Sequence, residues 1–129
     1  MRMRKMKNLD SRMERCAALR IAEPAALKGN WRSLKPDATA LWVEVGCGKG
    51  KFTAETAAAN PDVLMIAVER CREAMVVAME KAQSMNLTNV FYIDMDVAKI
   101  EEIFNREEID RLFINFPDPG PGRRTPSAD

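Results

Sequence analysis

The sequence has no histidine, few cysteines and no long hydrophobic run. Because histidine is absent, the chain cannot build Ser-His or Cys-His catalysis, or a histidine metal site, from its own residues. The three cysteines show no C-x-x-C spacing, which argues against a zinc site or a disulfide framework. No apolar stretch approaches the ~20 residues that a membrane helix needs. We therefore expect catalysis by carboxylates, backbone dipoles or a bound cofactor, with no metal and no membrane.

Charge is balanced overall but uneven along the chain. The net charge is +1, so the protein has no general attraction for polyanions. Residues 1–20, however, hold seven cations against Asp10 and Glu14. Such an arm can neutralise phosphates, although a solvated, frayed terminus is the simpler interpretation. The basic start is not followed by an apolar signal core, so we expect a cytoplasmic, reducing setting.

Four short apolar runs alternate with helical patterns along the rest of the chain. The helical pattern from 72 to 85 places its apolar residues on one face, which we interpret as core; these are Met75, Ala78, Met79, Ala82 and Met85. We interpret Cys71 as a packing residue, with a nucleophile as the alternative. The predicted strands are 41–45, 63–68, 90–93 and 111–116, and the predicted helices are 52–59, 72–85 and 98–106.

This alternation predicts an α/β fold with a parallel sheet and right-handed crossovers. In such sheets the ligand binds beyond the carboxyl ends of the strands, near the point where the strand order reverses. The residues that follow each predicted strand are therefore the candidates for function.

A glycine-rich turn follows the first predicted strand. Gly46, Gly48 and Gly50 permit a sharp turn and a close approach of a ligand to the backbone. Their spacing is G-x-G-x-G rather than the G-x-G-x-x-G of dinucleotide-binding proteins. The preceding acid, Glu44, suits a cationic partner such as the ammonium group of S-adenosylmethionine. A tight turn without a ligand is the alternative.

Acidic residues also follow the second and third predicted strands. Glu69 is placed to accept hydrogen bonds from both ribose hydroxyls of a nucleoside. After the third strand come Asp94 and Asp96, where an acid can accept from an adenine amino group. Each acid alone could be a solvated loop charge, but three in succession indicate a nucleoside cofactor.

The fourth predicted strand ends in the segment Asn115-Phe116-Pro117-Asp118-Pro119. An Asn or Asp at a strand end, followed by a turn that proline stiffens, is where a methyl acceptor would be held. A plain connecting loop is the alternative.

Together these segments resemble the bacterial tRNA (guanine-N7)-methyltransferase family over residues 1 to about 119. The most specific match is Asn-Phe-Pro-Asp-Pro at 115–119; further matches are Met1-Arg2-Met3-Arg4, Lys28-Gly29-Asn30-Trp31, the segment 44–50, Asn60-Pro61-Asp62, Glu69, Asp96 and Ile109-Asp110-Arg111. The resemblance implies the N-terminal portion of a Rossmann-like class I methyltransferase sheet, with S-adenosylmethionine as cofactor and tRNA as partner.

The resemblance also implies roles for individual residues. Asp118 would be catalytic and would contact the cofactor, and Asn115 would contact the tRNA together with the basic residues Arg2, Arg4 and Lys5. The other expected cofactor-binding residues are Glu44, Gly46, Gly48, Gly50, Glu69 and Asp96. The implied reaction is methyl transfer to N7 of guanine. Its in-plane lone pair needs no deprotonation, which fits a chain without histidine.

The chain departs from the family after residue 119. Gly120 occupies the position of a family tryptophan, and Gly122 that of a substrate-binding lysine. We expect a basic lead-in at 1–40, an incomplete cofactor-binding domain at 41–119 and a divergent tail at 120–129, with the chain truncated. The fourth strand would then be an exposed edge, which predicts self-association and weak or no methyl transfer.

Three other functions remain open at this point. The chain could be a non-catalytic remnant that binds the cofactor. It could be a nicotinamide-dependent oxidoreductase, which Glu69 allows but the glycine spacing and Glu44 disfavour. It could also be a nucleic-acid-binding module that acts through its basic arm.

Overall fold

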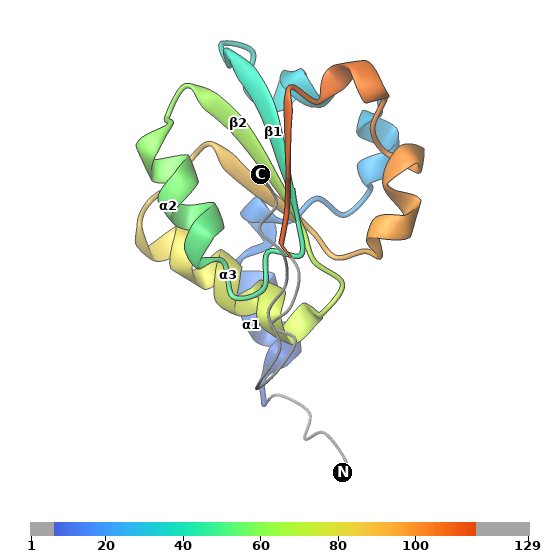
Figure 1. The fold of residues 1–129 in the computed structure, drawn as a ribbon. Helices are drawn as coiled ribbons and strands as arrows, with labels where there is room; N and C mark the ends of the chain where they lie inside the picture. The colour runs from blue at the N-terminus through green and yellow to red at the C-terminus, as the bar shows by residue number, and fades with distance from the viewer. Residues whose placement is uncertain (1–6, 116–129) are drawn as a thin grey trace, which may run out of the picture.

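The computed structural model describes residues 7–115, which form a four-stranded parallel sheet with helices on both faces (Figure 1). This confirms the predicted α/β fold. The strands lie in the order β3-β2-β1-β4. The chain therefore moves outward from β1 to β3 and then returns, so that β4 pairs with the free side of β1. The strand bounds are β1 Ala40–Val45, β2 Val63–Val68, β3 Val90–Ile93 and β4 Arg111–Ile114.

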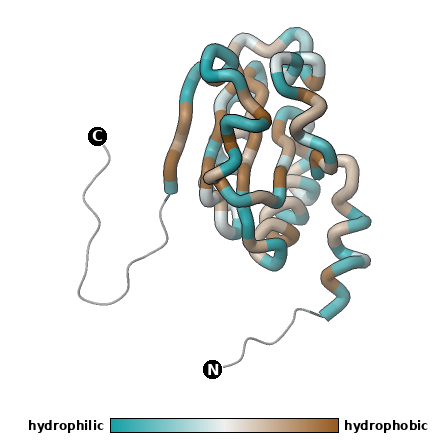
Figure 2. Tube along the Cα trace, turned by 90° about the vertical axis from the view of Figure 1, so that its right-hand side faces the viewer, coloured by the Kyte–Doolittle hydropathy of each residue, from teal (hydrophilic) through white to brown (hydrophobic). Residues whose placement is uncertain are grey.

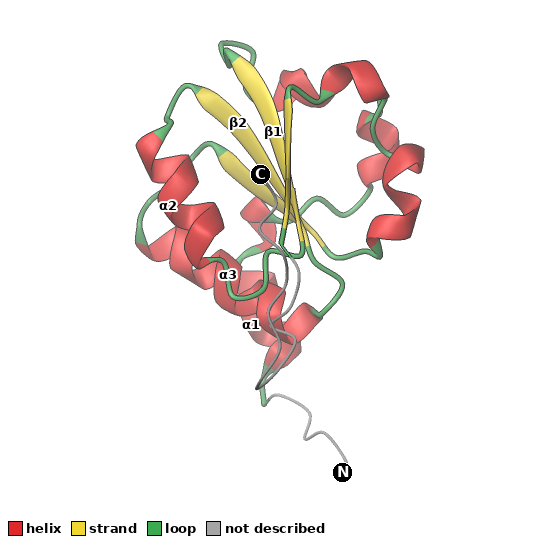
Figure 3. Cartoon of the chain, viewed as in Figure 1, coloured by secondary structure: helices red, strands yellow, loops and turns green. Residues whose placement is uncertain are grey.

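Helices cover both faces of the sheet (Figure 3). The helices on the two faces are of different types. One face carries three α-helices, which are α1 (Leu9–Arg15), α2 (Lys51–Ala59) and α3 (Arg72–Ser84). The other face carries short 3-10 helices, which are η2 (Pro24–Leu27), η3 (Trp31–Leu34), η4 (Val97–Glu102) and η5 (Arg106–Glu108). A further turn, η1 (Ala17–Leu19), follows α1. Within residues 7–115, no helix is long and apolar enough to cross a membrane.

The side chains of β1 and β2 alternate between these two layers. All six residues of β2 are buried, because both faces of the sheet are covered. Leu64, Ile66 and Val68 belong to the core under the 3-10 helices, whereas Met65 and Ala67 belong to the core under the α-helices. Since Glu44 is in register with Ala67, the period of two residues turns Glu44 toward the α-helices.

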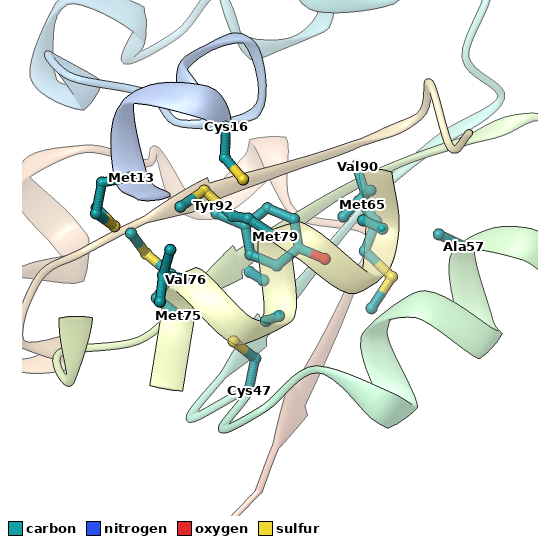
Figure 4. Close-up of a cluster of buried hydrophobic side chains, with 13 residues drawn as sticks. Met13, Cys16, Cys47, Ala57, Met65, Met75, Val76, Met79, Val90 and Tyr92 are labelled. Atoms are coloured by element: carbon teal, nitrogen blue, oxygen red, sulfur yellow. The ribbon is translucent and has the colours of Figure 1, made fainter. Parts of the chain in front are cut away.

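The core under the α-helices is built largely from sulfur-containing and small side chains around Tyr92 (Figure 4). Met75, Ala78, Met79 and Ala82 of α3 are all buried there, as the sequence predicts. The prediction for Met85 is wrong, because its side chain is 39% exposed. The helix ends at Ser84, so Met85 is the C-cap and no longer follows the helical period.

The core on the other face is centred on Trp31, which the lead-in segment supplies. Its side chain is fully buried and stacks on Phe104, with ring centroids 4.7 Å apart. The indole Nε1 donates a hydrogen bond to the Ile103 carbonyl at 2.6 Å. The Glu108 carboxylate also accepts hydrogen bonds from the backbone N–H groups of Gly29 and Trp31. The lead-in is therefore part of the packed fold.

The predicted helix at 98–106 is not a continuous helix. Asp96 accepts from the Ala98 N–H, and Asn105 forms a capping box with Glu108. These side chains compete for backbone groups and divide the segment into η4 and η5. The apolar face is nevertheless kept, because Ile103 and Phe104 are buried and Ile100 packs against them. The predicted fourth strand is also shorter, since β4 ends at Ile114.

Candidate functional site

A cavity of about 660 Å³ opens at the carboxyl ends of the strands. Residues that end or follow all four strands line it, as expected for a ligand site where the strand order reverses. The lining residues are Val45, Gly46, Gly48, Val68, Glu69, Arg70, Cys71, Met95, Asp96, Val97, Ile114 and Asn115. A volume of this size is in the range of small-molecule sites.

The three glycines after β1 all have positive φ, but they serve different purposes. A Cβ on Gly46 would lie 2.5 Å from the Asn115 carbonyl oxygen, and a Cβ on Gly50 would lie 2.5 Å from the Ala78 Cβ. These two glycines therefore allow close packing. Gly48 has nothing within 4 Å of such a Cβ, and it lines the cavity. Gly50 is buried and is not part of the lining.

Glu69 holds the glycine loop and the start of α3 together. Its Oε1 accepts a hydrogen bond from the Gly48 N–H at 2.8 Å, and its Oε2 accepts from the Cys71 N–H at 3.0 Å. The carboxylate lines the cavity and is only half-buried. Because each carboxylate oxygen has a second lone pair, both can still accept from a ligand.

The structure distinguishes between the two aspartates that follow β3. Asp94 forms ion pairs with Arg20 at 3.0 Å and Arg72 at 3.5 Å, and it does not line the cavity. Asp96 lines the cavity and is exposed. Its Oδ1 accepts from the Ala98 N–H at 3.0 Å, which leaves Oδ2 available to a ligand. This is the aspartate that the sequence assigned to the cofactor.

Glu44 does not line the cavity, but it contacts Asn115, which does. It is fully buried within β1, and it accepts hydrogen bonds from the Thr53 hydroxyl and the Asn115 Nδ2. Burial raises the pKa of Glu44, the two hydrogen bonds oppose this shift, and the charge of Glu69 adds to it. A positive charge bound in the cavity would favour the ionised form of Glu44.

Asn115 joins the end of β4 to the glycine loop. Its backbone N–H donates to the Val45 carbonyl at 3.1 Å, and its side chain donates to Glu44. It also lines the cavity. Of the acids expected at one rim of the sheet, Glu69 and Asp96 thus share a cavity, and Asn115 connects Glu44 to it.

Three residues of this region were not predicted. Thr53 stands in the first turn of α2, where only the folded structure brings it to Glu44. Arg70 follows Glu69 in the cavity wall. The interpretation of Cys71 as a packing residue is wrong, because its side chain is exposed and lines the cavity. Its position two residues after Glu69, in the segment that follows β2, was the available signal.

The remaining predicted site residues lie outside the described part of the chain. These are Asp118, with its catalytic and cofactor-binding roles, and the tRNA-binding residues Arg2, Arg4 and Lys5. Their roles stay predictions.

Several curated proteins are similar to this chain in sequence. A tRNA (guanine-N(7)-)-methyltransferase from Halalkalibacterium halodurans is 40% identical over 81% of this chain and 47% of the relative. One from Clostridioides difficile is 41% identical over 76% of the chain and 46% of the relative. One from Bacillus licheniformis is 33% identical over 96% of this chain and 58% of the relative. The chain thus spans about half the length of the curated relatives it matches.

Solved structures share the fold. A 30S ribosomal A1408 methyltransferase from an uncultured bacterium has a TM-score of 0.55 and 26% identity, covering 69% of this chain and 43% of that one. An antibiotic-related methyltransferase has a TM-score of 0.58 at 15% identity, covering 69% and 46%. These likenesses confirm the Rossmann-like class I methyltransferase sheet. A family model described as "Putative methyltransferase" matches residues 38–126. The chain therefore belongs to this methyltransferase family, together with the bacterial tRNA (guanine-N(7)-)-methyltransferases.

Proposed function

We propose that this chain carries the S-adenosylmethionine-binding site of a tRNA (guanine-N7)-methyltransferase. The observation that supports this most directly is the cavity at the carboxyl ends of the four strands. Its lining brings together Gly48, Glu69, Asp96 and Asn115, which come from four separate strand ends. The relatives that are similar to this chain in sequence are named for this reaction.

The electrostatics of the cavity suit a cationic nucleoside. Among the described residues of its lining, Glu69 and Asp96 outnumber the one cation, Arg70, and the buried Glu44 contacts Asn115 in the wall. Burial raises the pKa of Glu44 most, and the like charge of Glu69 adds to that shift. A cationic ligand between the two acids would relieve the repulsion of these like charges. S-adenosylmethionine carries an ammonium and a sulfonium and supplies, when bound, a methyl group on electron-poor sulfur.

The lining residues have separable roles in holding such a ligand. The half-buried Glu69 would accept hydrogen bonds from the ribose hydroxyls through its remaining lone pairs. Asp96 would accept from the adenine amino group through Oδ2. Gly48 keeps the wall free of side-chain atoms at the point where the backbone meets the ligand.

Methyl transfer to N7 of guanine would make few chemical demands on the chain. The N7 lone pair lies in the ring plane and is available at neutral pH, so no general base is needed. The contribution of the chain would be alignment and a negative environment for positive charge. Within this proposal, Asp118 would stand at the acceptor, and Arg2, Arg4 and Lys5 would bind tRNA phosphates.

Calorimetry and a tRNA methylation assay test the two parts of this proposal. We expect S-adenosylmethionine to bind saturably to the unaltered chain. Glu69→Gln should weaken binding about tenfold, because one charged acceptor is lost. Mass spectrometry of digested tRNA should then detect 7-methylguanosine at a low level, in line with the weak transfer expected from the sequence.

A matched variant and the two readouts separate the alternatives. Glu55→Gln, on the exposed side of α2, should leave binding unchanged. Binding without 7-methylguanosine would instead support a cofactor-binding chain that does not catalyse transfer. A chain that shows no heat of binding with the cofactor would contradict the proposed site.

We further propose that the chain self-associates through β4 in the cytoplasm. In the described residues β4 pairs only with β1, and Leu112 and Ile114 are 47% and 49% exposed. Figure 2 shows this hydrophobic stretch on the outer strand that leads to the grey C-terminal trace. Such an apolar edge strand favours association with another chain. The three cysteines are free, which is compatible with a reducing compartment.

A further inference from the structure

The buried contact between Glu44 and Asn115 has a use beyond packing. Glu44 comes from β1, Thr53 from α2 and Asn115 from the end of β4, so the cluster ties three elements together. Burying a carboxylate carries a desolvation penalty, and apolar side chains of similar size could join the same elements without it. The cluster therefore points to a role at the adjoining cavity.

Hydrogen-bond chemistry fixes the orientation of the Asn115 carboxamide. Both oxygens of Glu44 accept hydrogen bonds, as an ionised carboxylate does. A carboxamide beside it must offer Nδ2, because Oδ1 would set lone pairs against lone pairs. Within residues 7–115, Oδ1 receives no hydrogen bond, and Asn115 is exposed to the cavity. The residue thus offers an oriented acceptor to whatever occupies the cavity.

We propose that Asn115 accepts a hydrogen bond from the ammonium group of the cofactor, with Glu44 acting as the positioning residue behind it. This inference rests on the proposed function, namely that the cavity holds S-adenosylmethionine. Glu44 then acts on the cofactor through the Asn115 carboxamide rather than by contact. Asn115 gains a cofactor role beside the tRNA contact predicted from the sequence.

The strand order indicates which end of the cofactor reaches Asn115. In the order β3-β2-β1-β4, Asp96 and Glu69 lie on the β3 and β2 side, where they would hold the adenosine. Asn115 and Gly46 lie on the opposite, β1 and β4 side. The amino-acid part of the cofactor is the part left for that side. An ammonium has donors only, so it needs acceptors, and the negative charge of Glu44 lies directly behind the one offered.

The test compares two ligands by calorimetry with four proteins. S-adenosylhomocysteine keeps the ammonium, whereas 5′-methylthioadenosine lacks the whole amino-acid part. The proteins are the unaltered chain, Asn115→Ala, Glu44→Gln and the double variant. Asn115→Ala should lower the affinity for S-adenosylhomocysteine about tenfold and leave that for methylthioadenosine within about twofold. Glu44→Gln should cost about tenfold alone but less than about twofold in the Asn115→Ala background.

Other outcomes of this comparison would contradict either the inference or the proposed function. If Glu44→Gln costs the same in both backgrounds, Glu44 acts independently of Asn115 and the inference is wrong. If Asn115→Ala weakens both ligands equally, its role is structural, which also overturns the inference. If the unaltered chain binds neither ligand, the proposed function fails instead. Retained binding of methylthioadenosine shows that each variant is folded, and Glu55→Gln on the exposed side of α2 is the matched control.

Discussion

At the scale of single residues, Tyr92 stands out because its buried hydroxyl has no hydrogen-bond partner in the part of the chain that the structure describes. The side chain is fully buried in the methionine-rich core, and within residues 7–115 the hydroxyl has no hydrogen bond (Figure 4). An unpaired buried hydroxyl costs stability, since it has given up its hydrogen bonds to water. Burial also raises the pKa of Tyr92, with smaller contributions from Cys47 and Glu44.

We predict that Tyr92→Phe makes the protein more stable. Urea denaturation at pH 7 should show a gain of about 1 kcal/mol, because the variant removes an unsatisfied polar group at constant shape. The gain should grow above about pH 10, the ordinary tyrosine pKa. There the unfolded tyrosine loses its proton while the folded one keeps it, which lowers the stability of the unaltered protein alone. A variant that is less stable at pH 7 would show that the hydroxyl has a partner.

At the scale of elements, the lead-in segment and the 3-10 layer hold each other in place. Trp31 stacks on Phe104 and donates to the Ile103 carbonyl, both just after η4, and Lys28 donates to the Glu101 carbonyl of η4 at 2.8 Å. Arg32 forms an ion pair with Asp110 at 2.5 Å, and Asp110 also accepts from the Leu41 N–H. Asp110 immediately precedes β4, so the lead-in supports the strand that completes the cavity.

Trp31→Ala should therefore destabilise the protein strongly. We expect a loss of about 3–5 kcal/mol in urea denaturation followed by circular dichroism, as for other buried aromatic residues. Trp31→Phe should cost less, about 1–3 kcal/mol, because stacking remains but the Ile103 carbonyl loses its donor. The comparison is Trp42→Ala, since Trp42 is only partly buried. Equal losses for Trp31→Ala and Trp42→Ala would contradict this account.

Local sequence patterns predicted the strands well and the side-chain partners poorly. Val63–Val68 is a buried strand because both faces of the sheet are covered, and an unbroken apolar run shows this directly. The contact of Glu44 with Asn115 joins β1 to β4, and no local pattern indicates which strands become neighbours. Likewise, only the folded structure shows that Asp94 pairs with Arg20 and Arg72, and that Asp96 rather than Asp94 lines the cavity. The break between η4 and η5 depends on competing side-chain caps.

At the scale of the whole molecule, the sheet is covered unevenly. β1 and β2 are buried between two layers, whereas Leu112 of β4 lies beside an open groove of about 320 Å³. Ile100, Phe104 and Ile109 contribute apolar surface to the same groove. A second chain that covers this region would bury apolar surface that now faces water.

Leu112→Lys should weaken self-association. Light scattering across a range of concentrations should show association of the unaltered chain and a shift toward monomer in the variant. The reason is that a charged side chain at an exposed strand opposes pairing with a second chain. Ala58→Lys, which adds the same charge on the exposed side of α2, is the control and should not alter the association. An unaltered chain that stays monomeric at every concentration would rule out this interface.

The return of β4 to β1 also links ligand occupancy to the integrity of the sheet. The cavity has walls from all four strand ends, so it is complete only while β4 is paired with β1. Any molecule that fills the cavity and touches Ile114 or Asn115 must therefore strengthen that pairing. By reciprocity, a change that weakens the pairing of β4 with β1 also lowers the affinity for the bound molecule, by the same factor.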